Sequence, residues 1–432
     1  MATETEDKEF VPTFEIKSHP TDIRAYQNPF PDYMSAMSNE TSLIHIAQEI
    51  VISTDFINKI KYFIAEQLEV IGDNYLDKLS YQDDKTVYTG SCGLAFLYIK
   101  LGNGMYKRDS KAAKSFLEMA GEILETARDE VYKAYPAFLM GDGGPWTLSI
   151  LHAQATGDKD SIAKYTAELV HLHHHVVCSK KNNEDELLYG SAGYLYCLLL
   201  VRKLVPEANI NDELVKKVSD VLVEHGIKLA QSLGPIPPLM YSFAAKQYIG
   251  AAHGLAGVVY ILLCSAELMG SNENMDNIIS CLEYLQGVKY ASGNFPTQFG
   301  DTDDMRLHWC HGAPGIAVLF CKAYSVTHNI KYLKTAVQAA RLVWDRGLIK
   351  KGISLCHGVA GNAYTFLQLF KVTQDAEYLY NALKFAEWCI DATKARGRPD
   401  RPFTLFEGLA GAIYFLNDLL DIKNAAFPGY EL

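Results

Sequence analysis

The sequence predicts an all-α protein, a seven-fold (α/α) double barrel of about fourteen helices. The main observation is a Gly-x-x-Gly pair that recurs seven times, with 46 to 64 residues between successive first glycines. Each pair opens a mostly apolar run, and amphipathic stretches separate these runs. Repeats of this length bury their apolar faces against their neighbours, and a ring is the simplest closure. The pairs are Gly90/Gly93, Gly141/Gly144, Gly190/Gly193, Gly254/Gly257, Gly312/Gly315, Gly358/Gly361 and Gly408/Gly411.

The amphipathic stretches predict the outer helices. Each has one polar and one apolar face, as expected of a helix with one side in water. The runs after the glycines are apolar nearly all round, which indicates buried inner helices. The chain therefore alternates outer helix, loop, glycine corner and inner helix. The predicted outer helices cover residues 55–79, 111–130, 159–174, 212–231, 272–285, 330–346 and 376–393.

This alternation fixes the direction of the inner helices. Each follows an outer helix, so all inner N-termini face one end of the barrel. We expect their N–H groups and dipoles to converge on one basin that favours anions and thiolates. Residues 1–42 are polar and contain prolines. They are predicted to form an N-terminal extension that lies over a single barrel domain of residues 43–432.

Composition excludes several classes of protein. A net charge of −11 and a pI of about 5.6 argue against nucleic acid as the main partner, because phosphate binding needs a basic surface. No uncharged apolar run reaches the ~18 residues typical of a transmembrane helix. The start of the chain lacks the apolar region of a secretion signal. Nine dispersed cysteines indicate reduced thiols. We expect a cytoplasmic protein, and these features are also compatible with peripheral membrane association or a nuclear location.

Two neighbouring corners carry Cys-His directly before the first glycine. The fifth reads WCHG and the sixth LCHG. Zinc prefers thiolate and imidazole ligands, and adjacent corners lie side by side in a ring. We therefore predict that Cys310, Cys356 and His357 hold one zinc ion per chain. Three protein ligands leave a fourth position open for substrate, as in catalytic sites. The alternative is a closed structural site that also uses His311.

A further histidine stands at the fourth corner. His253 precedes Gly254 and should face the same basin. Imidazole exchanges protons near neutral pH, so His253 is a candidate general acid or base. The alternative is a corner histidine bonded to a nearby carbonyl group.

Four motifs carry a resemblance to a known family. They read HGLAG, WCHGAPG, SLCHGVAG and LFEGLAG, and in this order and spacing they resemble the lanthionine synthetase C-like family over residues 24–421. The segment RAYQNPFPDY, residues 24–33, resembles the N-terminal segment of the eukaryotic, glutathione-binding branch. That family has a seven-fold double α-barrel, which is the fold that the periodicity predicts.

The resemblance also implies roles for particular residues. It implies that the predicted zinc ligands are the family's three ligands and that His253 is the catalytic acid or base. It implies that Arg306 and Trp309 line the site. Bacterial members carry an acidic residue shortly before the third glycine pair, where Glu186 or Asp185 stands here. The implied glutathione-binding residues are Lys351, Arg24 and either Arg396 or Arg398.

The function implied by the resemblance is zinc-dependent transfer of glutathione. The glutathione thiol, deprotonated at zinc, would add to dehydroalanine or dehydrobutyrine in proteins or peptides and form a thioether. His253 would then give a proton to the α-carbon, while an arginine and the helix N-termini stabilise the enolate. The partners implied are glutathione and peptides that contain dehydroamino acids.

Other functions were weighed against this one. A non-catalytic glutathione- and zinc-binding protein could regulate a kinase or another signalling partner, but the intact ligands and His253 favour an enzyme. A lanthipeptide cyclase would need a cognate precursor peptide, and the N-terminal segment argues against it. A farnesyltransferase-like toroid normally has six-fold barrels with an Asp-Cys-His zinc site. A glycosidase toroid needs a facing carboxylate pair, which the corners do not offer.

Overall fold

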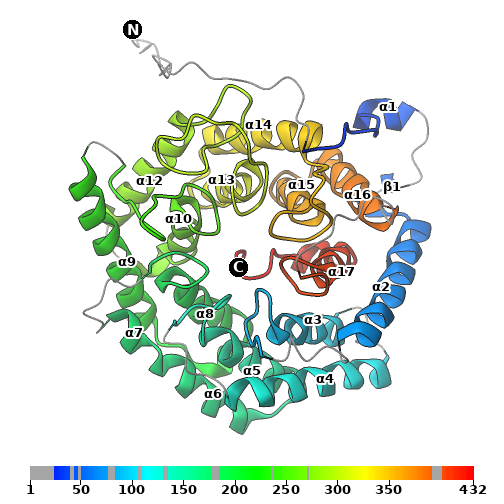
Figure 1. The fold of residues 1–432 in the computed structure, drawn as a ribbon, viewed down its shortest axis with the longest axis horizontal. Coiled ribbons are helices and arrows are strands. Elements are labelled where there is room, and N and C mark those ends of the chain that lie inside the picture. The colour runs from blue at the N-terminus through cyan, green and yellow to red at the C-terminus, as the bar shows by residue number, and fades with distance from the viewer. Residues whose placement is uncertain are drawn as a thin grey trace.

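Seven inner helices form a closed ring, which confirms the predicted fold class (Figure 1). Each packs against the next around the ring, and the last packs against the first. Nearly all their side chains are buried, as their uniformly apolar sequences predict. The inner helices are α3 (Ser91–Asn103), α5 (Gly143–Thr156), α8 (Ser191–Leu204), α10 (Leu255–Cys264), α13 (Ala313–Thr327), α15 (Val359–Thr373) and α17 (Leu409–Leu419).

The computed structural model describes most of the chain. The described residues are 24–38, 43–46, 50–75, 83–104, 109–129, 135–177, 184–234, 237–269, 272–391 and 401–432.

A second ring of outer helices surrounds the first (Figure 1). Their ends lie close to the predicted ones because amphipathic periodicity and capping residues agree. For example, Asn211 and Asn329 cap α9 and α14 by accepting backbone N–H groups. The outer helices are α2 (Thr54–Tyr75), α4 (Ser110–Asp129), α6 (Lys159–His171), α9 (Asp212–Leu233), α12 (Asn272–Gly287), α14 (Ile330–Arg346) and α16 (Ala376–Asp391).

The other elements are short. Strands β1 (Ile44–Ile46) and β2 (Ile50–Ile52) pair antiparallel, and α1 (Tyr33–Ser38) contacts α16. None of the described helices is long and apolar enough to cross a bilayer. The remaining short helices are α7 (His173–Val177), α11 (Ala266–Met269), and the 3-10 turns η2 (Pro206–Ala208) and η4 (Ile422–Asn424).

The described part of the predicted N-terminal extension lies along α14 and α16. Asn28 donates a hydrogen bond to the carbonyl of Trp344 at 2.7 Å. The ring of Phe30 packs against Trp344 and Trp388, with centroid distances of 6.4 and 6.3 Å. The described part of the extension, from Arg24 onward, therefore packs on the outside of the barrel.

Inside each corner, the preceding loop accepts a hydrogen bond from a backbone N–H group at the start of the inner helix. In six corners the residue after the first glycine donates its N–H to the carbonyl six residues before that glycine, as Ser91 does to Asp84. In the fifth corner the N–H of Ala313 donates to the side chain of Asn294 instead. We expected these N–H groups to face the basin. The structure corrects this for one amide per corner, because the N–H after each first glycine is already bonded to a loop carbonyl or, in the fifth corner, to Asn294.

A second set of hydrogen bonds joins each corner to the next. Backbone N–H groups one or two residues before the first glycine donate to the neighbouring corner at six of the seven junctions. At the seventh, between the third and fourth corners, the N–H of Leu188 donates to the carboxylate of Glu186. The six bonds run from Ala252 to Cys310, Cys310 to Cys356, Cys356 to Phe406, Phe406 to Tyr88, Tyr88 to Leu139, and Met140 to Leu188.

Residues 425–432 fill the axis of the barrel, and the C-terminus lies inside the ring (Figure 1). The hydroxyl of Tyr430 donates to the carbonyl of Gly315 on α13, and the N–H of Gly429 donates to the hydroxyl of Tyr196 on α8. Phe427 is completely buried. This segment, which we call the axial plug, closes the space that seven helices leave at the centre of a ring.

The close approach of backbones at the corners gives a stability prediction. A Cβ atom at Gly361 would collide with the carbonyl of Leu355. We expect Gly361→Ala to lower the free energy of unfolding by about 1–3 kcal/mol, measured by denaturant titration, because overpacking must displace the backbone. Gly72 in α2 has open space around it. Gly72→Ala should leave stability unchanged or raise it by up to about 1 kcal/mol. Equal effects of the two substitutions would contradict this packing.

The axial plug gives a second, pH-dependent prediction. Burial raises the pKa of Glu431 from 4.5 to about 7. Between these two values the unfolded chain releases a proton that the folded protein keeps, so stability falls as pH rises through this window. Glu431→Gln removes this loss. The stability of the variant relative to the natural protein should therefore rise by about 2–3 kcal/mol between pH 5 and pH 8.

The control for this prediction is an exposed glutamate on α4. Glu125→Gln should show a constant offset from the natural protein over the same pH range. A constant offset for Glu431→Gln as well would mean that Glu431 does not stay protonated in the folded state.

Candidate metal centre and acid/base site

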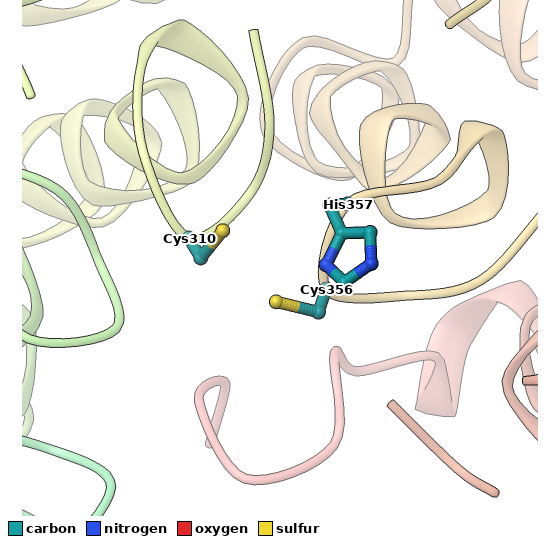
Figure 2. Close-up of side chains that lie close together, drawn as sticks. All are labelled: Cys310, Cys356 and His357. Carbon is teal, nitrogen blue, oxygen red and sulfur yellow. The ribbon is translucent and has the colours of Figure 1, made fainter. Parts of the chain in front are cut away.

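Two neighbouring corners bring three metal-ligating groups together. Cys310 comes from the corner before α13, and Cys356 and His357 come from the corner before α15 (Figure 2). Their ligand atoms all lie within 4.8 Å of one another. The N–H of Cys310 donates to the carbonyl of Cys356, so the junction bond itself holds the two thiols side by side. Both cysteines are buried, and His357 is partly exposed.

A tyrosine from a third corner completes the surroundings of Cys356. The hydroxyl of Tyr88 donates to Cys356 Sγ at 2.7 Å. A hydrogen bond from the Cys356 thiol to Cys310, followed by burial, raises the pKa of Cys356. A bound cation would reverse this effect, because it stabilises a thiolate. The donor set therefore suits a soft divalent metal better than two free thiols.

The ring of Trp309 lies behind the thiols and not in the basin. It has no exposed surface, and it stacks on Phe427 of the axial plug at 4.5 Å. Phe406 and Tyr430 also contact it, at 5.6 Å each. Trp309 therefore supports the corner that carries Cys310 and cannot contact a substrate directly in this conformation.

His253 is held by a buried carboxylate. Its Nδ1 lies 2.8 Å from Glu186 Oε2, and Glu186 has no exposed surface. The same carboxylate accepts the N–H groups of Leu188 and Tyr189, at 2.9 and 2.6 Å. Three donors therefore fix the position of Glu186, which in turn fixes the imidazole. Asp185 pairs with a different residue, His225, at 3.1 Å, so the structure places Glu186, and not Asp185, beside His253.

His311 lies between the two groups but joins neither. Among the described residues, the cluster of possible metal ligands does not include it. Its ring lies 6.5 Å from that of His253. Burial, followed by the charge of Arg306, lowers the pKa of His311 to about 3. The position of His311 outside this cluster does not favour the closed four-ligand site.

Two of the basic residues predicted to bind glutathione lie on neighbouring backbone segments, because the N–H of Lys350, next to Lys351, donates to the carbonyl of Arg24 at 2.8 Å. Lys351 is exposed and lines a cavity of about 180 Å³ that Glu407 also lines. Arg24 contacts Met305, next to the exposed Arg306, through a 3.3 Å interaction with the sulfur. Arg396 and Arg398 lie outside the described residues.

Sequence reasoning missed two residues of this region. Tyr88 stands two residues before Gly90, the same corner position as Cys310 and Cys356, so the repeat contained a signal for it. Phe243 lies in a long connection and stacks on His253 with a centroid distance of 4.2 Å. No periodic feature marks it.

A cavity of about 730 Å³ lies at the other end of the barrel. Its walls come from the C-terminal ends of inner helices and from the axial plug, and include Lys100, Lys203 and Glu431. None of the metal-ligating residues lines it.

Comparisons with known proteins agree with this fold and these motifs. The family model described as "Lanthionine synthetase C-like protein" matches residues 81–432. The chain is 35% identical over 412 residues to "Glutathione S-transferase LANCL1" of Danio rerio, an alignment that covers 95% of this chain and 99% of that protein. The structure called "Nisin cyclase" has the same fold, with a TM-score of 0.63 and 17% identity, over 85% of this chain and 94% of that one. The chain therefore belongs to the lanthionine synthetase C-like family.

Proposed function

We propose that this protein is a zinc-dependent enzyme that adds the thiol of glutathione to dehydroalanine or dehydrobutyrine residues in proteins or peptides. The observation that carries the proposal is the three-ligand cluster of Cys310, Cys356 and His357, close to a histidine held by a buried carboxylate. The name of the 35% identical relative supports glutathione as the co-substrate.

The residues present fit zinc. Two thiolates and one imidazole are ligands that zinc takes in catalytic sites. Bound there, zinc would lower the pKa of a thiol so that a nucleophile exists at neutral pH. Tyr88 would keep its hydrogen bond to Cys356 Sγ, because burial raises the pKa of Tyr88 and the phenol stays protonated. Such a bond orients the ligand from outside the metal's own coordination shell.

His253 is placed to handle the proton. The thiolate adds to the β-carbon of the dehydroamino acid, and the electron pair of the double bond moves toward the neighbouring carbonyl. Because Glu186 holds Nδ1, the free Nε2 atom of His253 is the one that can give a proton to the α-carbon. Glu186 also accepts a hydrogen bond from the imidazole, so His253 can take up another proton after each turnover.

Charge that develops on the carbonyl oxygen needs a donor. The first amides of the inner helices are bonded within their corners, so they cannot fill this role. Arg306 is exposed, and its charge acts on His311 within the site. We therefore assign enolate stabilisation to Arg306. We assign recognition of glutathione's carboxylates to Lys351, with Arg24 and Arg398 as further candidates.

Glutathione as co-substrate also agrees with a location where thiols stay reduced. The eight described cysteines form no disulfide, and burial raises the pKa of Cys197 to about 12, as expected of an unreactive core thiol. We propose that the protein works in the cytoplasm, where thiols stay reduced.

Mass spectrometry of a dehydroalanine peptide incubated with protein and glutathione tests this function. We expect one glutathione per dehydroalanine with the natural protein. His253→Ala should keep its metal but slow the addition by about 10²–10⁴-fold, because it removes a general acid or base. Turnover by His253→Ala equal to that of the natural protein across pH 6–9 would make His253 a structural residue.

The same experiment separates the enzyme from a binding protein. A protein that binds glutathione, measured by calorimetry, yet forms no thioether with any dehydroamino-acid peptide would be a non-catalytic regulator. Gln at position 186 cannot accept from three donors, so Glu186→Gln should also slow addition while zinc content stays the same.

The metal assignment is tested by composition and spectroscopy. We expect about one zinc per chain, with two sulfur ligands, one imidazole and one exchangeable ligand in X-ray absorption. Cys356→Ala should lose the zinc and the activity together. The matched control is His311→Ala, which should keep the zinc. Two imidazoles and no exchangeable ligand would instead support the closed structural site.

A further inference from the structure

Four aromatic side chains form a continuous wall on one side of the basin. They come from the connections before the second, third and fourth corners. Their rings follow one another at 5.5 Å from Tyr135 to Tyr189, 5.4 Å from Tyr189 to Phe243, 4.2 Å from Phe243 to His253, and 5.9 Å from His253 to Tyr248. We call Tyr135, Tyr189, Phe243 and Tyr248 the aromatic wall.

The wall is open to solvent and leads to the metal centre. Tyr135 is 44% exposed, and the other three rings are half-buried. At its inner end Tyr248 lies 5.4 Å from His311, the residue after Cys310. Aromatic side chains in contact with one another at a protein surface mark binding sites, because they offer large contact area at low conformational cost.

Backbone strain holds the middle of the wall in place. Phe243 and Lys246 exchange two backbone hydrogen bonds around a two-residue turn, Ala244–Ala245. Both alanines have positive φ, 48° and 61°, in a position where asparagine and glycine are usual. Strain of this kind is common at functional sites. Phe243 begins this turn, and its ring lies flat on His253, with 4° between the ring planes.

Charge divides the basin into two sides. The positive charges of Arg306 and Lys351 act on His311, at the metal end. The charged groups nearest Tyr189, in the wall, are the carboxylates of Glu186 and Asp84. Glutathione carries two carboxylates and one amine, so the side with the exposed Arg306 and Lys351 suits it better. The wall is therefore left for the other substrate.

We propose that the aromatic wall binds the peptide substrate by packing against an apolar side chain next to the dehydroamino acid. This inference rests on the proposed function and specifies its substrate. A flanking leucine or phenylalanine would bury its side chain on the wall, while the reacting residue lies at its inner end, between His253 and the metal ligands. A flanking aspartate would be disfavoured by the negative charges beside Tyr189.

Binding of unreactive peptides tests the wall without requiring catalysis. Three fluorescein-labelled peptides carry alanine in place of dehydroalanine and leucine, glycine or aspartate on both sides of it. In fluorescence anisotropy, the zinc-loaded protein should bind the leucine peptide about tenfold more tightly than the glycine peptide, because burial of most of one leucine side chain has that effect. The aspartate peptide should bind most weakly.

Substitutions at the exposed end of the wall supply the matched controls. Tyr135→Ala should reduce the preference for leucine over glycine to about threefold, because part of the contact area is lost. Tyr135→Phe keeps the ring and should keep the preference. Tyr62→Ala removes a more exposed tyrosine, 74% against 44% for Tyr135, from the outer helix α2 and should change nothing.

Two results would overturn the inference. One is equal binding of the leucine and glycine peptides. The other is displacement of the leucine peptide by glutathione, which would mean that glutathione binds at the aromatic wall. The dehydroalanine forms of the same peptides separate this from the proposed function. Thioether formation without a preference for the flanking residue would contradict peptide binding by the aromatic wall and would support the proposed enzyme. Selective binding without thioether formation would contradict the proposed enzyme and would support a peptide-binding aromatic wall.

Discussion

The hydrogen bonds that join each glycine corner to the next are the constraint on which the site depends. The glycines let each loop pack closely on the start of its own inner helix, which holds the corner in the shape that makes these bonds. The bonded residues stand one or two positions before each first glycine, so their side chains gather at one level of the ring. The fifth, sixth and first corners place Cys310, Cys356 and Tyr88 at that level. The candidate metal centre and the phenol that bonds Cys356 therefore follow from the symmetry of the fold, with no loop dedicated to building them.

One junction of the ring differs from the others, and the candidate acid/base pair lies there. Between the third and fourth corners, Glu186 accepts the N–H groups of Leu188 and Tyr189, and among the described residues no backbone hydrogen bond joins these two corners. This junction lacks the backbone hydrogen bond that the other six have. In its place, a carboxylate without exposed surface is held by two amides and directed at His253. A regular seventh junction would have left that histidine without an orienting partner.

The repeat explains what the sequence could predict. Helix alternation, ring closure and the Cys310, Cys356 and His357 cluster all depend on features that recur at one spacing, and the structure brings these residues together as expected. Phe243 and the axial plug were not predictable in this way, because each acts through contacts between segments far apart in the chain. The expectation that the first N–H groups of the inner helices would be free to face the basin was wrong for a local reason. In six corners a loop carbonyl six residues before the first glycine accepts that N–H, and in the fifth corner the side chain of Asn294 accepts it.

The axial plug links the stability of the barrel to the metal centre. Phe427 stacks on Trp309, and Trp309 precedes the ligand Cys310. Phe427 also contacts Phe406, which stacks on Tyr88 at 4.5 Å, and Tyr88 bonds Cys356. Both thiols therefore rest on the same buried aromatic cluster, whose centre comes from the C-terminal segment. Close packing allows such a cluster little freedom to relax, so it fixes the separation of the two sulfur atoms before any metal binds. Pre-positioned ligands lose less conformational entropy when they bind a metal, and this is the physical reason to expect a residue as distant in sequence as Phe427 to affect the affinity of the site.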